Sequence, residues 1–253
     1  DPMLGATTGG LDPRPKAGSP ALNSANVQAA PAGLVPADYL GAFGAGNLWV
    51  RGWTALEQQG KLVSFGSVNG NVVTVTADNI HGQTFWTKDN TYVLDGFVYV
   101  EDGEELHIEA GTVIKANADT GANSTALFVT RGGRIEANGT ADNPIIFTSV
   151  LDSTVGTTGN TLGEKVLDPA TESGKWGGIT LLGKGILNSA ADATGNAATP
   201  IYDVYEGQPD NVFNGRNVFR FGGNDDTDSS GVLRYVSIRY TGVQLAANKE
   251  LNG

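Results

Sequence analysis

The stretch FVYVEDGEELHIEAGTVIKA, residues 97–116, alternates apolar and polar side chains and is interrupted every few residues by glycine. Leu106 and Ile108 are two residues apart, so both point to one face of a strand, while His107 between them points to the other. Pieces of similar length recur from Thr91 onward, each bounded by Gly, Asn or Asp. The sequence therefore predicts many short strands, each with one buried face.

The spacing of these pieces predicts how the strands are arranged. Leu127 follows Leu106 by 21 residues, and Gly133 follows Gly111 by 22. A repeat near this length is typical of solenoids, in which three short strands form one coil and each strand stacks in parallel on its equivalent about 4.8 Å away. We therefore expect an all-β parallel β-helix over residues 67–253.

Three stretches depart from this pattern. Residues 152–174 and 188–228 are rich in Gly, Thr, Asn and Ala and are expected to be loops that leave the coils. Residues 1–66 are rich in Pro and Gly, with a short helical turn expected near residues 53–60.

A phase change in the apolar pattern also predicts a bend near Tyr235, with Arg234 and Arg239 both facing outward.

Composition excludes several classes of function. The 253 residues include 16 Lys and Arg against 27 Asp and Glu, a net charge of −11, so a phosphate backbone is repelled and nucleic acid is not an expected partner. The absence of Cys excludes disulfides, thiolate zinc sites and cysteine nucleophiles. No apolar run approaches the roughly 20 residues that span a bilayer, so no transmembrane segment is expected.

Candidate chemistry is sparse. His81 and His107 are the only histidines, and no G-x-S-x-G motif accompanies them. Asp225, Asp226 and Asp228, in GNDDTDSSG, offer oxygen ligands of the kind that Ca²⁺ prefers. The alternative is a turn whose carboxylates accept hydrogen bonds from backbone N–H groups. Calcium is the single cofactor that the sequence suggests.

Tryptophans offer a second kind of site. Exposed aromatic rings stack on sugars, and the chain has four tryptophans that would serve: Trp49, Trp53, Trp86 and Trp176. The alternative is that a tryptophan beside glycine in a coil packs on the core.

Four segments together resemble a known family: DNTYVLDGFVYVEDGEELHIEAGTVIKA (89–116), GGRIEANGTADNPIIFTS (132–149), GKWGGITLLGKGILN (174–188) and FGGNDDTDSSGVLRYVSIRYTG (221–242). They are similar to successive coils of secreted right-handed parallel β-helix proteins of Gram-negative bacteria, in the pectin-lyase-like superfamily, of the type often sorted by type IX-like secretion. The resemblance implies a right-handed coil and an extracellular, cell-surface location.

Residues 1–66 resemble the C-terminal end of such a β-helix, although they precede its beginning. The order fits a fragment of a tandem array, a permuted subunit, or a part of a longer polypeptide. In each case the open ends of the solenoid would stack on neighbouring β-helices, because a solenoid end exposes unpaired backbone groups and apolar core.

The expected function is a non-enzymatic, extracellular structural or adhesive protein that self-associates end to end into a rod, filament or surface array. The alternatives are a module that binds extracellular or cell-surface polysaccharide, and a calcium-dependent polysaccharide lyase. Superfamily lyases use Ca²⁺-bridging Asp residues with an Arg or Lys base. Asp225, Asp226 and Asp228 near Arg234 and Arg239 would imitate that arrangement, but the fold alone does not give the function.

Overall fold

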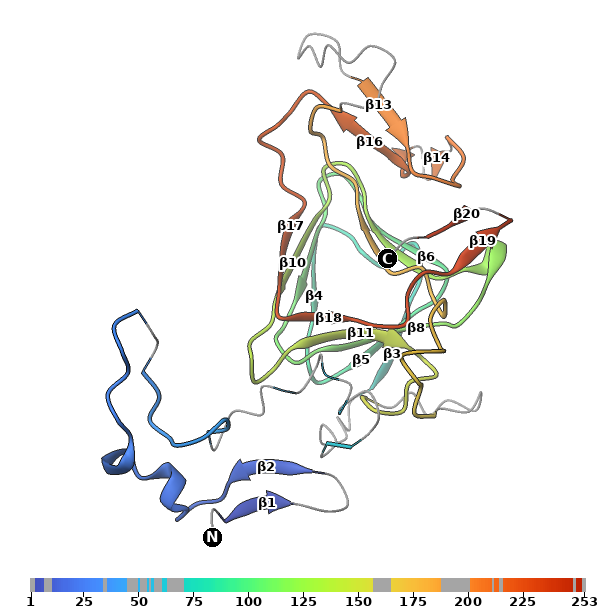
Figure 1. The fold of residues 1–253 in the computed structure, drawn as a ribbon. Helices are drawn as coiled ribbons and strands as arrows, with labels where there is room; N and C mark the ends of the chain where they lie inside the picture. Colours follow the sequence, from blue (N-terminus) through green and yellow to red (C-terminus); the bar gives the residue numbers. More distant parts are fainter. Residues whose placement is uncertain are drawn as a thin grey trace.

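The computed structural model describes residues 3–6, 11–33, 36–44, 50, 54, 56, 61–62, 71–156, 165–187, 201–210, 212–213, 216–247 and 249–251. Its main body is a parallel β-helix of three sheets, seen end-on as a triangle in Figure 1. The first sheet has the strand order β18-β11-β8-β5-β3, the second β17-β10-β7-β4, and the third β12-β9-β6. Every pairing within these sheets is parallel.

The strands of the three sheets are three to five residues long. In the first sheet they are β3 (Val72–Val75), β5 (Thr91–Leu94), β8 (Val113–Ala116), β11 (Ile145–Ser149) and β18 (Val236–Ile238). In the second they are β4 (Gln83–Trp86), β7 (Glu105–Ile108), β10 (Arg134–Asn138) and β17 (Gly231–Arg234). In the third they are β6 (Phe97–Val100), β9 (Ala126–Val129) and β12 (Ile179–Leu181).

The register shows which residues are equivalent in successive coils. Leu106 lies opposite Thr84 on one side and Ile135 on the other, which gives coil steps of 22 and 29 residues. The predicted equivalence of Leu106 and Leu127 is therefore wrong, since Leu127 belongs to the third sheet and pairs with Val98. The error arises because strands of all three sheets carry the same short apolar pattern.

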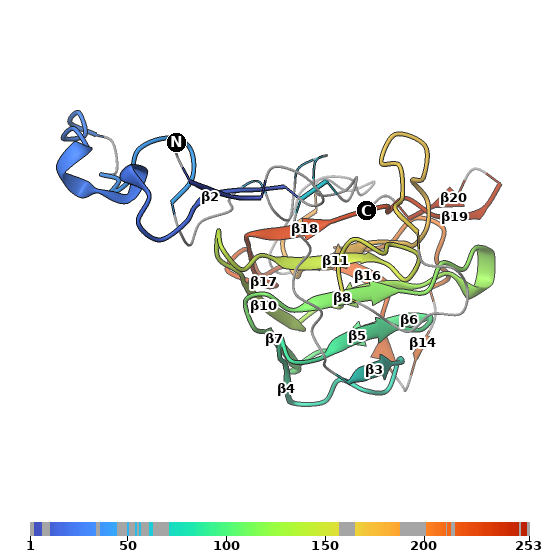
Figure 2. The same cartoon turned by 90° about the horizontal axis from the view of Figure 1, so that it is seen from below.

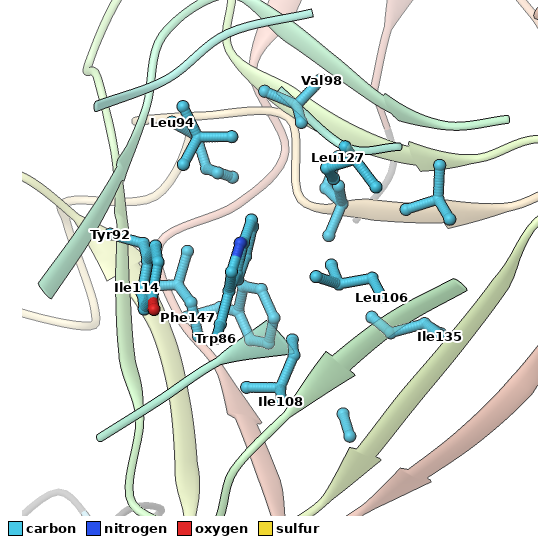
Figure 3. Packing of buried hydrophobic residues seen from close by; sticks show 14 of the residues in the cluster. Trp86, Tyr92, Leu94, Val98, Leu106, Ile108, Ile114, Leu127, Ile135 and Phe147 are labelled. Atoms are coloured by element: carbon cyan, nitrogen blue, oxygen red, sulfur yellow. The ribbon is translucent and has the colours of Figure 1, made fainter. Parts of the chain in front are cut away.

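Ladders of apolar side chains fill the triangle (Figure 3). Tyr92, Ile114 and Phe147 occupy the same ladder position on neighbouring strands, and each is at most 5% exposed. At one end, the ring of Trp86 stacks on that of Tyr92 with centroids 4.7 Å apart. Burying each such side chain stabilises the fold by about 1.5–3 kcal/mol, so the ladders dominate stability.

Insertions cover the outer faces of two sheets. Residues 150–156 and 165–178 join β11 to β12 and pack Val155 on Val113 and Ile146 of the first sheet. Between β12 and β17 lies an antiparallel pair, β13 (Ile201–Val204) with β16 (Arg220–Gly223), beside β14 (Val212–Phe213) and β15 (Arg216–Asn217). Next to β16, Phe219 packs against Phe128 of the third sheet.

The chain turns sharply between β17 and β18. Tyr235 is the single residue between them and has φ +47°, in the left-handed region. The bend predicted near Tyr235 is confirmed. Arg234 is exposed as expected. Arg239 also faces outward from the first sheet, as predicted, but its residue is only 3% exposed, because the insertion after β11 covers it.

The N-terminal segment forms its own small structure. Strands β1 (Leu4–Ala6) and β2 (Asp12–Pro15) pair antiparallel with each other, followed by two 3₁₀ turns, η1 (Pro20–Leu22) and η2 (Ser24–Asn26). Leu62 and Val50 are buried with Leu11 and Phe43 in a cluster separate from the coils. The helical turn predicted near residues 53–60 lies outside the described residues except at positions 54 and 56.

Figure 2 shows the coils from the side, with β3 and β4 at one end and β17 and β18 at the other. At the first coil, Trp86, Val75 and Ile80 are at most 3% exposed. At the last coil, each sheet exposes one residue in a ladder position: Leu181 at 44%, Leu233 at 40% and Ile238 at 41%.

The other elements are the 3₁₀ turn η3 (Gly121–Asn123) and the strands β19 (Gln244–Ala246) and β20 (Lys249–Glu250). No helix within the described ranges is long and apolar enough to cross a membrane.

Candidate functional site

The outer face of the second sheet carries an open hollow of about 550 Å³. Most of its residues come from the outward positions of β4, β7 and β10 and from the turns after β4 and β7, because alternate residues of each strand face away from the core. The centre is Phe85, whose residue is 63% exposed and whose ring stacks on the imidazole of His107 with centroids 4.7 Å apart. Three glutamates and one arginine line the hollow: Glu105, Glu109, Glu136 and Arg134.

Hydrogen bonds between strands fix these polar side chains. Glu105 Oε2 accepts from Gln83 Nε2 at 3.1 Å and lies 3.1 Å from His107 Nε2. One carboxylate oxygen of Glu136 pairs with Arg134 at 2.7 Å, and the other accepts from Asn138 at 3.3 Å. The face therefore presents an aromatic ring beside carboxylates whose positions are already set.

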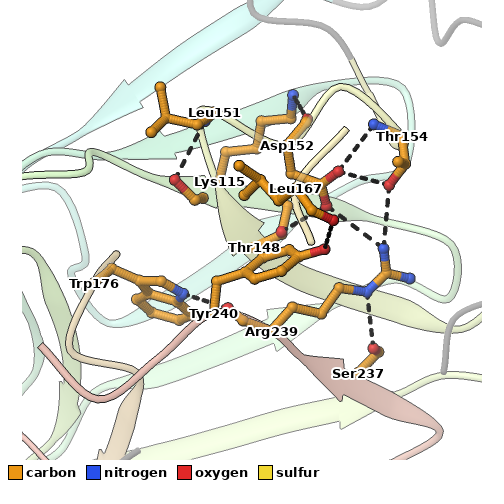
Figure 4. Close-up of polar contacts among 11 residues, drawn as sticks. Lys115, Thr148, Leu151, Asp152, Thr154, Leu167, Trp176, Ser237, Arg239 and Tyr240 are labelled. Carbon is orange, nitrogen blue, oxygen red and sulfur yellow. Dashed lines mark hydrogen bonds and ion pairs between the residues drawn. The ribbon is translucent and has the colours of Figure 1, made fainter. Parts of the chain in front are cut away.

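A second polar cluster lies buried outside the first sheet (Figure 4). Lys115 is fully buried, and its ammonium donates to the backbone oxygen of Asp152 at 2.8 Å. The Asp152 carboxylate accepts from the hydroxyls of Thr148 at 2.7 Å and Thr154 at 2.6 Å. It also lies 3.5 Å from a guanidinium nitrogen of Arg239. These bonds attach the insertion after β11 to the sheet.

Neighbouring groups extend this attachment. Tyr240 donates to the backbone oxygen of Leu167 at 3.3 Å, and burial raises the pKa of the Tyr240 phenol to about 12. The indole nitrogen of Trp176 donates to the backbone oxygen of Arg239 at 2.7 Å. The cluster is enclosed by the chain, so its evident role is to hold the insertion in place.

The three aspartates predicted to bind calcium each serve a different part of the loop. Asp225 accepts from the backbone N–H and hydroxyl of Thr227, at 3.0 and 2.7 Å, and these bonds lower the pKa of Asp225. Asp226 accepts from the backbone N–H of Ile186 at 2.8 Å. Asp228 accepts from the backbone N–H of Lys184 at 2.8 Å. These contacts match the alternative of carboxylates that accept from backbone N–H groups.

Nowhere in the described part of the chain are three or more His, Asp and Glu side chains grouped so that they could hold a metal ion. The aspartates therefore do not fit a calcium site in the arrangement described. Calcium stays a prediction of the sequence, and no chemistry is derived through it.

Of the four predicted sugar-stacking tryptophans, the two that the structure describes are not available on the surface. Trp86 is 3% exposed and Trp176 is fully buried, while Trp49 and Trp53 lie outside the described residues. In QTFW, residues 83–86, the alternation of β4 turns Trp86 inward and its neighbour Phe85 outward. Phe85 was not predicted as a site residue, although alternation along this strand gives it the face opposite to that of Trp86. In the structure it lies opposite the outward His107.

Glu172 on the covering insertion carries a pH-dependent contact. Its carboxylate accepts from Lys165 at 2.6 Å and Lys175 at 2.7 Å, which lowers the pKa of Glu172 from 4.5 to about 2. A carboxyl whose pKa is lower in the folded chain stabilises the fold above its unfolded pKa and loses that contribution as pH falls towards its folded pKa.

We therefore expect wild type to melt at a higher temperature than Glu172→Gln above pH 4.5, and the difference to close as the pH falls to about 2. Melting temperatures of both proteins across this range provide the measurement. Asp168→Asn, on the same insertion, is the control for the effect of removing a charge. A difference that does not change with pH would contradict the assignment.

Comparison with known proteins agrees with this architecture. The family model described as a pectate-lyase like beta helix domain matches residues 78–253, which include all the coils from β4 onward. No curated protein and no solved structure matches the chain. The chain belongs to the pectate-lyase-like β-helix family.

Proposed function

We propose that this protein is a non-enzymatic structural β-helix that assembles end to end, at the extracellular surface that its sequence resemblance implies. The observation that carries the proposal is the last coil, where Leu181, Leu233 and Ile238 are exposed in ladder positions, one on each of the three sheets. Residues in ladder positions are normally covered by the next coil, so this end has the properties of an interface.

The opposite end offers a matching surface. Val73 on β3 occupies the same ladder as Tyr92 and is 37% exposed, and the ladder ends at Ile238 on β18. Among the described strands, β3 and β18 are the edges of the first sheet, and β4 and β17 those of the second. Edge strands pair readily with another chain, and contact between unlike ends repeats without closing.

The lyase alternative has less support. The pectate-lyase-like fold serves lyases and non-enzymes alike, so it does not decide the activity. Of the two arginines that could act as the base, Arg239 is buried beside Asp152, and only Arg234 is exposed on the outer surface. Asp225, Asp226 and Asp228 are each engaged by the loop itself.

Adjacent valines and leucines allow matched variants. On β17, Leu233 is in an inward ladder position and is 40% exposed, whereas Val232 faces outward and is 38% exposed. At the other end, on β3, Val73 is in an inward ladder position and is 37% exposed, whereas Val72 faces outward and is 44% exposed.

We expect wild type to form multiples of its 26.2 kDa mass in light scattering and rods in electron microscopy. Leu233→Lys or Val73→Lys should leave monomers, whereas Val232→Lys and Val72→Lys should assemble like wild type.

Mixing the two blocked variants tests which ends meet. Leu233→Lys retains a normal first coil and Val73→Lys a normal last coil, so the mixture should give a dimer that grows no further. Circular dichroism melts of each variant establish that it is folded. A wild-type protein that stays monomeric at high concentration, or a mixture that stays monomeric, would refute end-to-end assembly.

A further inference from the structure

The second sheet is the one whose outer face is left open. The insertion after β11 covers the first sheet through Val155, and the segment before β16 covers the third through Phe219. On the second sheet, the described residues leave Phe85 63% exposed, and the side chains of Glu105 and Arg134 keep 35% and 38% of their surfaces exposed. Large exposed aromatic surface beside a hollow commonly marks a binding site.

The polar groups of this face are suited to hydroxyl donors. Ionised carboxylates accept hydrogen bonds and donate none. Glu105 and Glu136 are both held by neighbours, Glu105 by Gln83 and His107, Glu136 by Arg134 and Asn138. Because these side chains are already ordered, binding loses little rotamer freedom. A ligand rich in hydroxyls and carrying a flat apolar face would contact both the ring of Phe85 and these carboxylates.

The charge of this face favours neutral hydroxyl-rich ligands over anionic ones. The hollow is lined by three glutamates and one arginine, Glu109 is paired with the nearby Lys88, and the whole chain carries a net charge of −11. An anionic chain such as polygalacturonate would place its carboxylates against those of Glu105 and Glu136, which is unfavourable. We propose that the outer face of the second sheet binds a neutral polysaccharide, with the ring of Phe85 as its stacking platform and Glu105 and Glu136 as acceptors of sugar hydroxyls.

The proposal does not depend on assembly, because Phe85 faces sideways from the coil and not along its axis. Its test uses affinity electrophoresis of the full chain in native gels containing a neutral galactan, mannan or β-glucan, with polygalacturonate as the anionic comparison. Wild type is expected to be retarded by at least one neutral polysaccharide and not by polygalacturonate. Phe85→Ala should weaken that binding about tenfold, because stacking and ring burial are lost.

Two control variants show whether the loss of binding is specific to the aromatic ring at position 85. Phe85→Tyr keeps an aromatic ring and should retain binding, while Tyr202→Ala removes an aromatic residue that is 44% exposed elsewhere and should leave binding unchanged. Retardation by polygalacturonate alone, by none of the polysaccharides, or equally for wild type and Phe85→Ala would each overturn the proposal. Light scattering of Phe85→Ala reports assembly separately.

Discussion

Replacing Ile108 with aspartate is expected to abolish the cooperative thermal unfolding of this protein. Ile108 is 4% exposed and lies between Trp86 and Ala137 in the ladder of the second sheet. Removing a large aliphatic side chain from a core costs about 2–5 kcal/mol. An ionised carboxylate without a partner adds several kcal/mol more, which together approach the 5–15 kcal/mol that stabilises a whole domain. Circular dichroism during heating provides the measurement.

Two variants calibrate this result. Ile108→Ala should lower the free energy of unfolding by about 2–5 kcal/mol while retaining a cooperative transition. Asn138→Asp places the same new charge on the exposed outer face of the neighbouring strand β10 and should cost less than about 1 kcal/mol. If Asn138→Asp were as damaging as Ile108→Asp, the assignment of inner and outer faces would be wrong.

Removing the carboxylate of Asp152 is expected to cost about 3–5 kcal/mol, because breaking a buried ion pair leaves its partners desolvated. Asp152→Ala deletes the acceptor of two threonine hydroxyls and the carboxylate beside the buried guanidinium of Arg239. The insertion after β11 then loses its central attachment to the first sheet. The midpoint of urea-induced unfolding, with its slope, measures the change.

Asp168→Ala provides the matched control for this variant. Asp168 is exposed on the same insertion and accepts from the backbone N–H of Ala170 at 2.9 Å, so its loss should cost about 1 kcal/mol or less. Asp152→Asn retains an oxygen acceptor without the charge and should lie between the two alanine variants. Similar losses for Asp152→Ala and Asp168→Ala would show that the buried cluster does not stabilise the fold.

Local alternation was sufficient to predict the strands and their faces around Leu106 and Ile108, because a strand with one buried face leaves a period-2 pattern. It was not sufficient to align the coils. The correct alignment pairs Val98 with Leu127 and Leu106 with Ile135, so that residues 98–108 match 127–137. That longer match was present in the sequence, but turns of unequal length between strands hide it from a search for one fixed period.

Side chains outside the coils were harder to place. Arg239 alternates correctly as an outward residue of the first sheet, yet it is buried, because an insertion distant in sequence folds over it and supplies Asp152. No local pattern carries that information. Phe85 is the reverse case, because its outward position follows from alternation alone. Tryptophan is a common sugar platform, but in this strand the tryptophan, Trp86, faces the core.

The insertion between β12 and β17 also affects the order of folding. Gln83 and Glu105, on β4 and β7, are bonded across 22 residues, whereas the bond from Arg134, the first residue of β10, to Ser229 before β17 spans 95. Each doubling of a flexible loop adds about 0.6 kcal/mol of closure entropy, so this pairing costs about 1.2 kcal/mol more to initiate. The first coils should therefore form a template early, and the last coil, with its exposed ladder residues, should dock onto that template late.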